Sequence, residues 1–107
     1  MPRRVVICAV LALLACFVYR DVPRFDFVNF DDPEYVTENP HVASGLNWRN
    51  VRWAFTSTGA ANWFPLTWLS LMTDASIWGA DDAGGFHVTN VVLHVANTAV
   101  LFLLVET

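Results

Sequence analysis

Two long apolar segments, one near each end of the chain, constrain the fold of this sequence more than any other feature. The first runs from Val5 to Tyr19 behind Arg3 and Arg4, and the second runs from Phe86 to Val105. Nearly all the remaining charge lies between them. A helix of about 20 residues spans about 30 Å, the thickness of a bilayer's hydrocarbon core. This distribution predicts an all-α membrane protein with two transmembrane helices around a polar loop, rather than one packed core.

The first apolar segment is short for a membrane span, and three interpretations of it stay open. A secretory signal peptide fits the charged start and the length, although the small-residue cleavage site is poor. The run "LLAC", which ends at Cys16, suggests a lipoprotein signal, but apolar residues follow it where a polar tether is expected. We favour an uncleaved transmembrane helix over residues 1–19. Arg3 and Arg4 then place the N-terminus in the cytoplasm by the positive-inside rule.

The second apolar segment, within residues 86–107, carries its polar residues on one helical face. They are spaced 3, 4 and 3 apart: His87, Asn90, His94 and Asn97. A polar face is costly against lipid, so it must meet other protein or a hydrated cavity. Hydrogen-bonded helix packing and a substrate pathway both satisfy that requirement. Two helices give this face little cover, so we expect the chain to be truncated, with further spans following Thr107.

Residues 20–85 then form an extracytoplasmic loop, which the capping signals divide into short helices. We expect helix starts at Asp32, Asn39 and Asn47, and a loop from Phe55 to Asn62. Residues 65–79 begin with Pro and end with Gly, as a capped helix does. This segment is too short to span and too apolar for water, which predicts an interfacial or protein-covered helix. All five tryptophans fall in the loop, and their rings suit the headgroup level of a membrane.

Net charge and residue spacing argue against nucleic-acid binding, against a disulfide within the first predicted helix and against a metal site on the second helix alone. The net charge is −4 and no basic stripe exists to neutralise phosphates, which argues against nucleic-acid binding. Cys8 and Cys16 are eight residues apart on the first predicted helix, about 12 Å along its axis, which is too far for a disulfide. His87 and His94 are similarly about 10 Å apart, so this helix alone holds no metal site.

Four acids cluster after the first apolar segment, and one of them has no evident structural role. Asp32 precedes Pro33 as an N-cap does, Glu34 complements the helix dipole, and Glu38 is expected to be solvated. Asp31 is left over. Between aromatic residues at a membrane surface, it could act as a general base or bind a divalent ion. The calcium-loop pattern of alternating acids with a central Gly is absent, so a self-contained calcium site is not expected.

Three motifs, in this order, resemble the start of the GT-C type membrane glycosyltransferases. They are "FVNFDDPEYVTENPHV", "NWFPLTWLSLMTDASIWG" and "GFHVTNVVLHVANTAVLFLL". The nearest resemblance is to the transmembrane and tetratricopeptide-repeat (TPR) O-mannosyltransferases and their bacterial relatives, and it covers nearly the whole chain from about Phe25. It implies a multi-pass body, often with a soluble repeat domain downstream.

The resemblance also implies an activity. Such enzymes transfer a sugar, here expected to be mannose, from a polyprenyl-phosphate donor to a protein hydroxyl on the outer face of the membrane. The family's essential acidic pair falls on Asp31 and Asp32. We expect Asp31 to be the base and Asp32 its hydrogen-bonding neighbour, with the roles exchangeable. A divalent metal as cofactor stays open, and the fragment alone is not expected to be active.

Four further residues are candidates for substrate binding. Arg49 and Arg52 are available to the lipid phosphate. His87 and the "NWFPLT" segment, which includes Asn62, are available to line the same cavity. The alternative, from a different class, is a non-enzymatic two-span protein whose loop docks a partner. The self-sufficient caps and aromatic residues of the loop favour that alternative, since neither needs a substrate.

Overall fold

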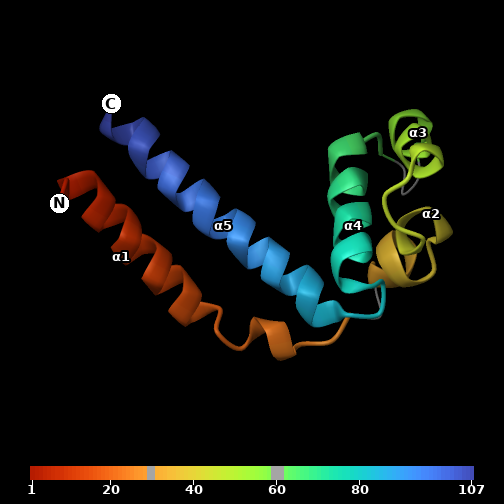
Figure 1. The fold of residues 1–107 in the computed structure, drawn as a ribbon, viewed down its shortest axis with the longest axis horizontal. Coiled ribbons are helices and arrows are strands. Elements are labelled where there is room, and N and C mark those ends of the chain that lie inside the picture. The colour runs from red at the N-terminus through yellow and green to blue at the C-terminus, as the bar shows by residue number, and fades with distance from the viewer. Residues whose placement is uncertain (29–30, 59–61) are drawn as a thin grey trace. The chain divides into compact units, whose positions relative to one another are not determined.

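The computed structural model describes residues 1–28, 31–58 and 62–107, and within these ranges all regular structure is helical (Figure 1). The elements are α1 (Arg3–Val18), η1 (Val22–Arg24), η2 (Pro33–Thr37), α2 (Pro40–Ala43), α3 (Trp48–Thr56), α4 (Pro65–Trp78) and α5 (Ala83–Glu106). The predicted all-α class is confirmed for this part of the chain. The chain divides into two compact units, which are described separately: unit 1 is Met1–Phe25 with His87–Thr107, and unit 2 is Asp26–Phe86.

Unit 1 consists of two long apolar helical segments. Residues Arg3–Arg24 and Ala83–Glu106 are each long and apolar enough to cross a membrane. α1 and the unit 1 part of α5 run antiparallel (Figure 1). Arg4 at the start of α1 accordingly forms an ion pair with Glu106 at the end of α5 (Nε–Oε2 2.8 Å). No residue of this unit is buried. Cys8 and Cys16 are both free thiols.

α5 begins at Ala83, three residues before the predicted start of the apolar segment. The cause is a cap that the sequence analysis did not assign: Asp82 Oδ1 accepts a hydrogen bond from Gly85 N–H at 3.0 Å. A carboxylate at this position satisfies an amide that has no partner inside the helix. Gly84 and Gly85 are therefore part of the helix. Gly85 also lies so close to Trp78 that a Cβ at that position would collide with the indole.

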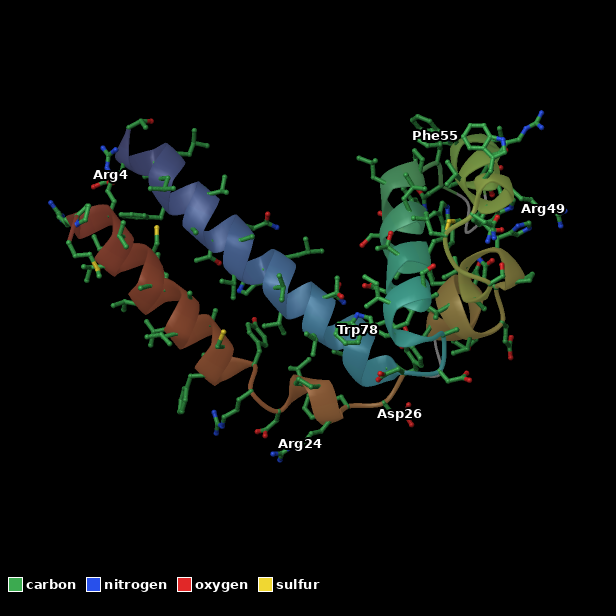
Figure 2. All side chains as sticks on the ribbon, viewed as in Figure 1. Arg4, Arg24, Asp26, Arg49, Phe55 and Trp78 are labelled. Carbon is green, nitrogen blue, oxygen red and sulfur yellow. The ribbon has the colours of Figure 1, made fainter. Side chains whose placement is uncertain are left out.

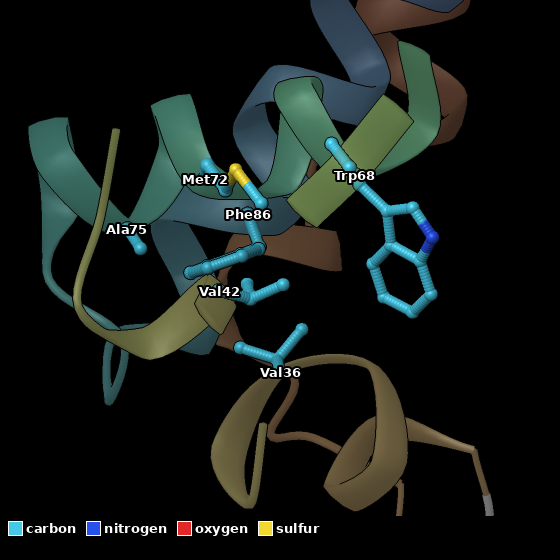
Figure 3. Close-up of a cluster of buried hydrophobic side chains, with 7 residues drawn as sticks. Val36, Val42, Trp68, Met72, Ala75 and Phe86 are labelled. Carbon is cyan, nitrogen blue, oxygen red and sulfur yellow. The ribbon is translucent and has the colours of Figure 1, made fainter. Parts of the chain in front are cut away.

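Unit 2 has its own small hydrophobic core (Figure 3). Four helical segments and the first turn of α5 supply its buried side chains, which are Val36, Val42, Ala54, Trp68, Met72, Ala75 and Phe86. α4 crosses this core and buries Trp68, Met72 and Ala75, while Leu66 and Ile77 stay exposed. The sequence predicts that this helix is either interfacial or covered by protein. One face of it is covered by the other residues of unit 2.

Aromatic rings pack around Trp68 at one end of the core. Tyr35 and Phe64 stack on the Trp68 indole at centroid distances of 5.3 and 5.0 Å, and Trp53 meets it edge-on at 5.0 Å. Offset and edge-to-face pairs of this kind add about 0.5–1.5 kcal/mol beyond area burial. Trp68 is only 1% exposed, so the expectation that all five indoles suit the membrane headgroups is wrong for this one.

Two of the three predicted caps in the loop are confirmed, and the third is wrong. Asn39 accepts from the amide of His41, and Asn47 accepts from the amide of Asn50. Asp32 makes no capping bond, because its own backbone is already helical (φ −58°, ψ −36°) where a cap residue needs an extended one. Its carboxylate instead accepts a 2.6 Å hydrogen bond from the Val28 amide.

A buried polar junction joins the end of α2 to α3 and α4. Asn50 is 3% exposed, and its Nδ2 donates to the carbonyl of Gly45 at 2.6 Å and to Ser44 Oγ at 2.9 Å. Gly45 has φ +87°, and a Cβ there would lie 2.6 Å from Ser76 Oγ on α4. The same Ser76 hydroxyl accepts from the amide of Leu46. The glycine is therefore required both by its backbone conformation and by the close approach of α4.

Candidate functional site

The two acids proposed for catalysis lie side by side but in different environments. Asp32 is half-buried, and the bond from the Val28 amide holds its carboxylate in place. Asp31 is exposed at the turn before η2, where its carbonyl accepts from the Tyr35 amide at 3.0 Å. Among the described residues, no hydrogen bond or ion pair engages the Asp31 carboxylate. One acid of the pair is thus restrained, and its neighbour is available to a ligand.

The two candidate arginines lie on the outer face of α3. Arg49 and Arg52 are exposed and three residues apart, so they occupy the same side of the helix, and Figure 2 shows Arg49 on that outer side. No ion pair in the described ranges involves either guanidinium group, and none joins them to Asp31 or Asp32. The structure therefore shows two available cations on α3 but does not bring them into contact with the acidic pair.

The remaining two candidates are separated between the units. Asn62 is exposed just before α4 in unit 2, whereas His87 belongs to unit 1. The expectation that both line one cavity stays a prediction. In the described part of the chain, no group of three or more His, Cys, Asp or Glu side chains is placed to hold a metal ion.

His87 lines a cavity of about 280 Å³ within unit 1. The other residues that line it are Tyr19, Val22, Asn90, Val91 and His94. The Tyr19 ring meets the His94 imidazole edge-on, with centroids 5.3 Å apart. Three of the four residues of the polar face of α5 therefore share a cavity with the residues that follow α1, and Asn97 is not among its lining. The spacing of the polar residues predicts this face of α5, but nothing in the sequence indicates that Tyr19 lies against it.

A second concave region lies in unit 2, where the end of α3 meets the start of α4. This groove of about 470 Å³ is lined by Phe55, Trp63, Phe64, Pro65, Leu66 and Thr67. Trp63 Nε1 donates to the Phe55 carbonyl at 2.8 Å, which ties the segment before α4 to the last turn of α3. The segment "NWFPLT" is predicted to line a cavity with His87; residues 63–67 of it line this groove, and the contribution of Phe55 was not predicted.

No protein-family model, curated protein or solved structure matches this chain.

Proposed function

We propose that this chain is the N-terminal part of a GT-C type membrane glycosyltransferase, in which Asp31 is the general base. The observation that carries the proposal is the contrast within the acidic pair. Asp31 has an exposed carboxylate with no partner in the described structure, whereas the carboxylate of Asp32 is held by the Val28 amide. A base must be reachable by the proton that it accepts, and a fixed neighbour helps to keep it in place.

In the proposed reaction, a hydroxyl of a protein acceptor attacks the anomeric carbon of a sugar carried on polyprenyl phosphate. The new bond joins the hydroxyl oxygen to that carbon on the side opposite the leaving group, so the configuration inverts. The bond from the anomeric carbon to the phosphate oxygen breaks, and its electron pair leaves with the lipid phosphate. The hydroxyl proton moves to the Asp31 carboxylate. A neutral hydroxyl is a poor nucleophile at neutral pH, which is why the reaction needs a positioned base.

The leaving phosphate gains charge as the bond breaks, and it needs cations or hydrogen-bond donors. Arg49 and Arg52 are proposed to supply guanidinium groups, because both are exposed and neither forms an ion pair among the described residues. Asn62 and His87 are proposed as further contacts to the donor. For His87 the support is its position in the cavity of unit 1, where neighbouring imidazole and amide groups can bind a polar group.

The test is sugar transfer by the protein that carries this segment, measured in membranes with a radiolabelled polyprenyl-phosphate mannose donor and an acceptor peptide. Asp31→Asn keeps the size of the side chain and removes the base, so transfer is expected to fall by about 10²-fold or more. Glu38→Gln is the matched control, because it neutralises another exposed acid of the same segment. Equal rates for Asp31→Asn and Glu38→Gln would exclude Asp31 as the base.

One observation favours the alternative of a non-enzymatic two-span protein whose loop docks a partner. Unit 2 closes a core of its own and satisfies two of its helix starts with its own side chains, without any ligand. This alternative predicts no sugar transfer by any form of the protein, and it predicts that unit 2 can be crosslinked to a second extracytoplasmic protein.

A further inference from the structure

The outer side of α3 and the start of α4 expose an unusual set of side chains. Trp48 is 80% exposed, Leu66 75%, Trp63 63% and Phe55 49%. Arg49 and Arg52 lie among them on α3. These six residues are called the α3 surface below. Large apolar side chains at such exposure remain in contact with water unless something covers them.

The geometry of α3 separates this surface from the core. At 100° per residue, Phe55, Trp48, Arg52 and Arg49 fall in that order within one third of the helix circumference. The two buried residues of α3, Asn50 and Ala54, lie on the opposite side. The helix therefore presents a mixed aromatic and cationic face outward, as amphipathic helices at membrane interfaces do.

The stretch of sequence that supplies this surface carries Lys, Arg, Asp and Glu charges of one sign only. Of the ten acidic residues in the chain, none lies between Glu38 and Asp74, and the only Lys or Arg residues in that interval are Arg49 and Arg52. The protein as a whole is acidic, with a net charge of −4. The α3 surface is thus a local cationic region, flanked in sequence by acidic segments on both sides.

The groove between α3 and α4 continues this surface. Phe55, Trp63 and Leu66 line it together with Phe64, Pro65 and Thr67. Its opening is held in place by the bond from Trp63 Nε1 to the Phe55 carbonyl. A preformed apolar groove beside two guanidinium groups matches the two parts of a phospholipid, an acyl chain and an anionic phosphate.

We infer that the α3 surface binds a bilayer that contains anionic phospholipids. The tryptophan rings, Phe55 and Leu66 enter the boundary between headgroups and acyl chains, and Arg49 and Arg52 contact the lipid phosphates. The two helices that are long and apolar enough to span a membrane would keep unit 2 near such a bilayer. The inference does not require that the chain transfers a sugar.

A second copy of the chain is a poorer match for this surface. A twofold self-interface places the same patch on both partners, so the arginines of one copy would face those of the other with no acid among them. An anionic lipid surface carries the opposite charge and an apolar layer beneath it, so it satisfies both kinds of side chain at once.

The test uses the chain reconstituted in vesicles, with Cys8→Ala and Cys16→Ala and one new cysteine that carries an environment-sensitive NBD fluorophore. Leu66→Cys probes the α3 surface, and Glu38→Cys is the matched control at another exposed position of unit 2. In vesicles of phosphatidylcholine and phosphatidylglycerol, the emission from position 66 is expected to be blue-shifted and to be quenched by brominated lipid. The emission from position 38 is expected to remain that of a probe in water.

Arginine variants then test the charge. Arg49→Gln and Arg52→Gln are each expected to lower the ratio of lipid-inserted to water-exposed probe about fivefold at low salt. Arg24→Gln, which removes a charge outside unit 2, is expected to leave the ratio unchanged. A water-like emission from position 66 in every lipid mixture would overturn the inference. The inference would also be overturned if the probe at position 66 were shielded from water as strongly in pure phosphatidylcholine as with phosphatidylglycerol, and if position 66 of two copies could be crosslinked. That result would indicate a protein cover.

Discussion

The two units of this chain differ in whether their helices pack around a buried core. In unit 2, short helices and the first turn of α5 bury a set of seven apolar side chains, and three of these, Val42, Ala54 and Met72, are completely inaccessible. In unit 1, α1 and the part of α5 from His87 onward contain no buried residue. The ends of α1 and α5 are joined by the Arg4–Glu106 ion pair, and Tyr19 packs on His94.

The difference shows that apolar composition and core formation are separate properties. A long helix satisfies its own backbone hydrogen bonds, which is the condition for stability in hydrocarbon, and the two long helices are apolar enough to cross a membrane. The helices of unit 2 are too short to be stable alone in water, so they depend on tertiary packing of their apolar sides. A change that disturbs a buried contact should therefore matter in unit 2, whereas a change of polarity should matter in unit 1.

The largest expected effect is the removal of the central indole of unit 2. Trp68→Ala should lower the free energy of unfolding of unit 2 by about 3–5 kcal/mol, because it leaves a cavity among the stacked rings. The measurement is a urea titration in mild detergent, followed by near-UV circular dichroism. Trp48→Ala is the matched control, since Trp48 is 80% exposed, and it should change the same free energy by less than about 0.5 kcal/mol. Equal effects would mean that the two indoles do not differ in burial.

The next effect should appear in unit 1 alone. Val10→Arg places a charge near the middle of α1 and should make membrane insertion about 2.5–3.5 kcal/mol less favourable. Carbonate extraction of membranes measures the inserted fraction. Val28→Arg adds the same charge at an exposed position of unit 2 and should not change that fraction. Full insertion of the Val10→Arg protein would argue that α1 does not lie in hydrocarbon.

A smaller effect is expected at the buried polar junction of unit 2. Asn50→Ala removes the donor to the Gly45 carbonyl and to Ser44 Oγ, and it should cost about 2–3 kcal/mol of unfolding free energy. The same urea titration measures it. Asn97→Ala, an exposed amide of unit 1, should leave the unfolding of unit 2 unchanged. A silent Asn50→Ala would show that water replaces the lost donor.

The smallest expected effect concerns the backbone at the same junction. Gly45→Ala should cost about 1–2 kcal/mol, because an L side chain at positive φ is strained and its Cβ would displace Ser76 Oγ. Gly79→Ala also has a positive φ, but a Cβ there meets nothing within 4 Å. The difference between the two unfolding free energies, measured by thermal denaturation, isolates the cost of moving α4. If Gly79→Ala cost more, the approach of Ser76 would be of no consequence.

Much of the helical framework could be predicted from the sequence because its signals are local. A cap bond joins a side chain to an amide two or three residues later, as Asn39 and Asn47 show. Pro65 marks the start of α4 because its ring fixes φ, and Gly79 marks the end because glycine readily adopts a positive φ, here 91°. The length and apolarity of the two terminal segments likewise predict helices that can span a membrane.

The candidate site was only partly accessible to the same reasoning. Asp31 was singled out because its carboxylate had no evident structural role, and its pairing with Asp32 was implied by the family resemblance. The arginines were chosen by residue type. The contrast between the Asp31 and Asp32 carboxylates depends on the hydrogen bond from the Val28 amide to Asp32, and residue type and spacing do not reveal that bond. The groove at Trp63 was predicted only in part: residues 62–67 were expected to line a cavity, but Phe55, which also lines the groove, lies on a different helix and gave no such signal.

Local sequence signals were enough to place the starts of α2 and α3, both ends of α4 and the two helices that can cross a membrane. Those properties depend on neighbours within one helical turn and on total apolarity. The burial of Trp68, the hydrogen bonds of Asn50 and the close approach of Ser76 to Gly45 arise only from tertiary contacts. Trp68 and Trp48 are the same residue type on neighbouring helices, and their burial differs because Tyr35, Trp53 and Phe64 cover one indole alone. Burial is set by partners that are distant along the chain, and α4 is apolar on most of its sides, so its periodicity does not identify the face that they cover.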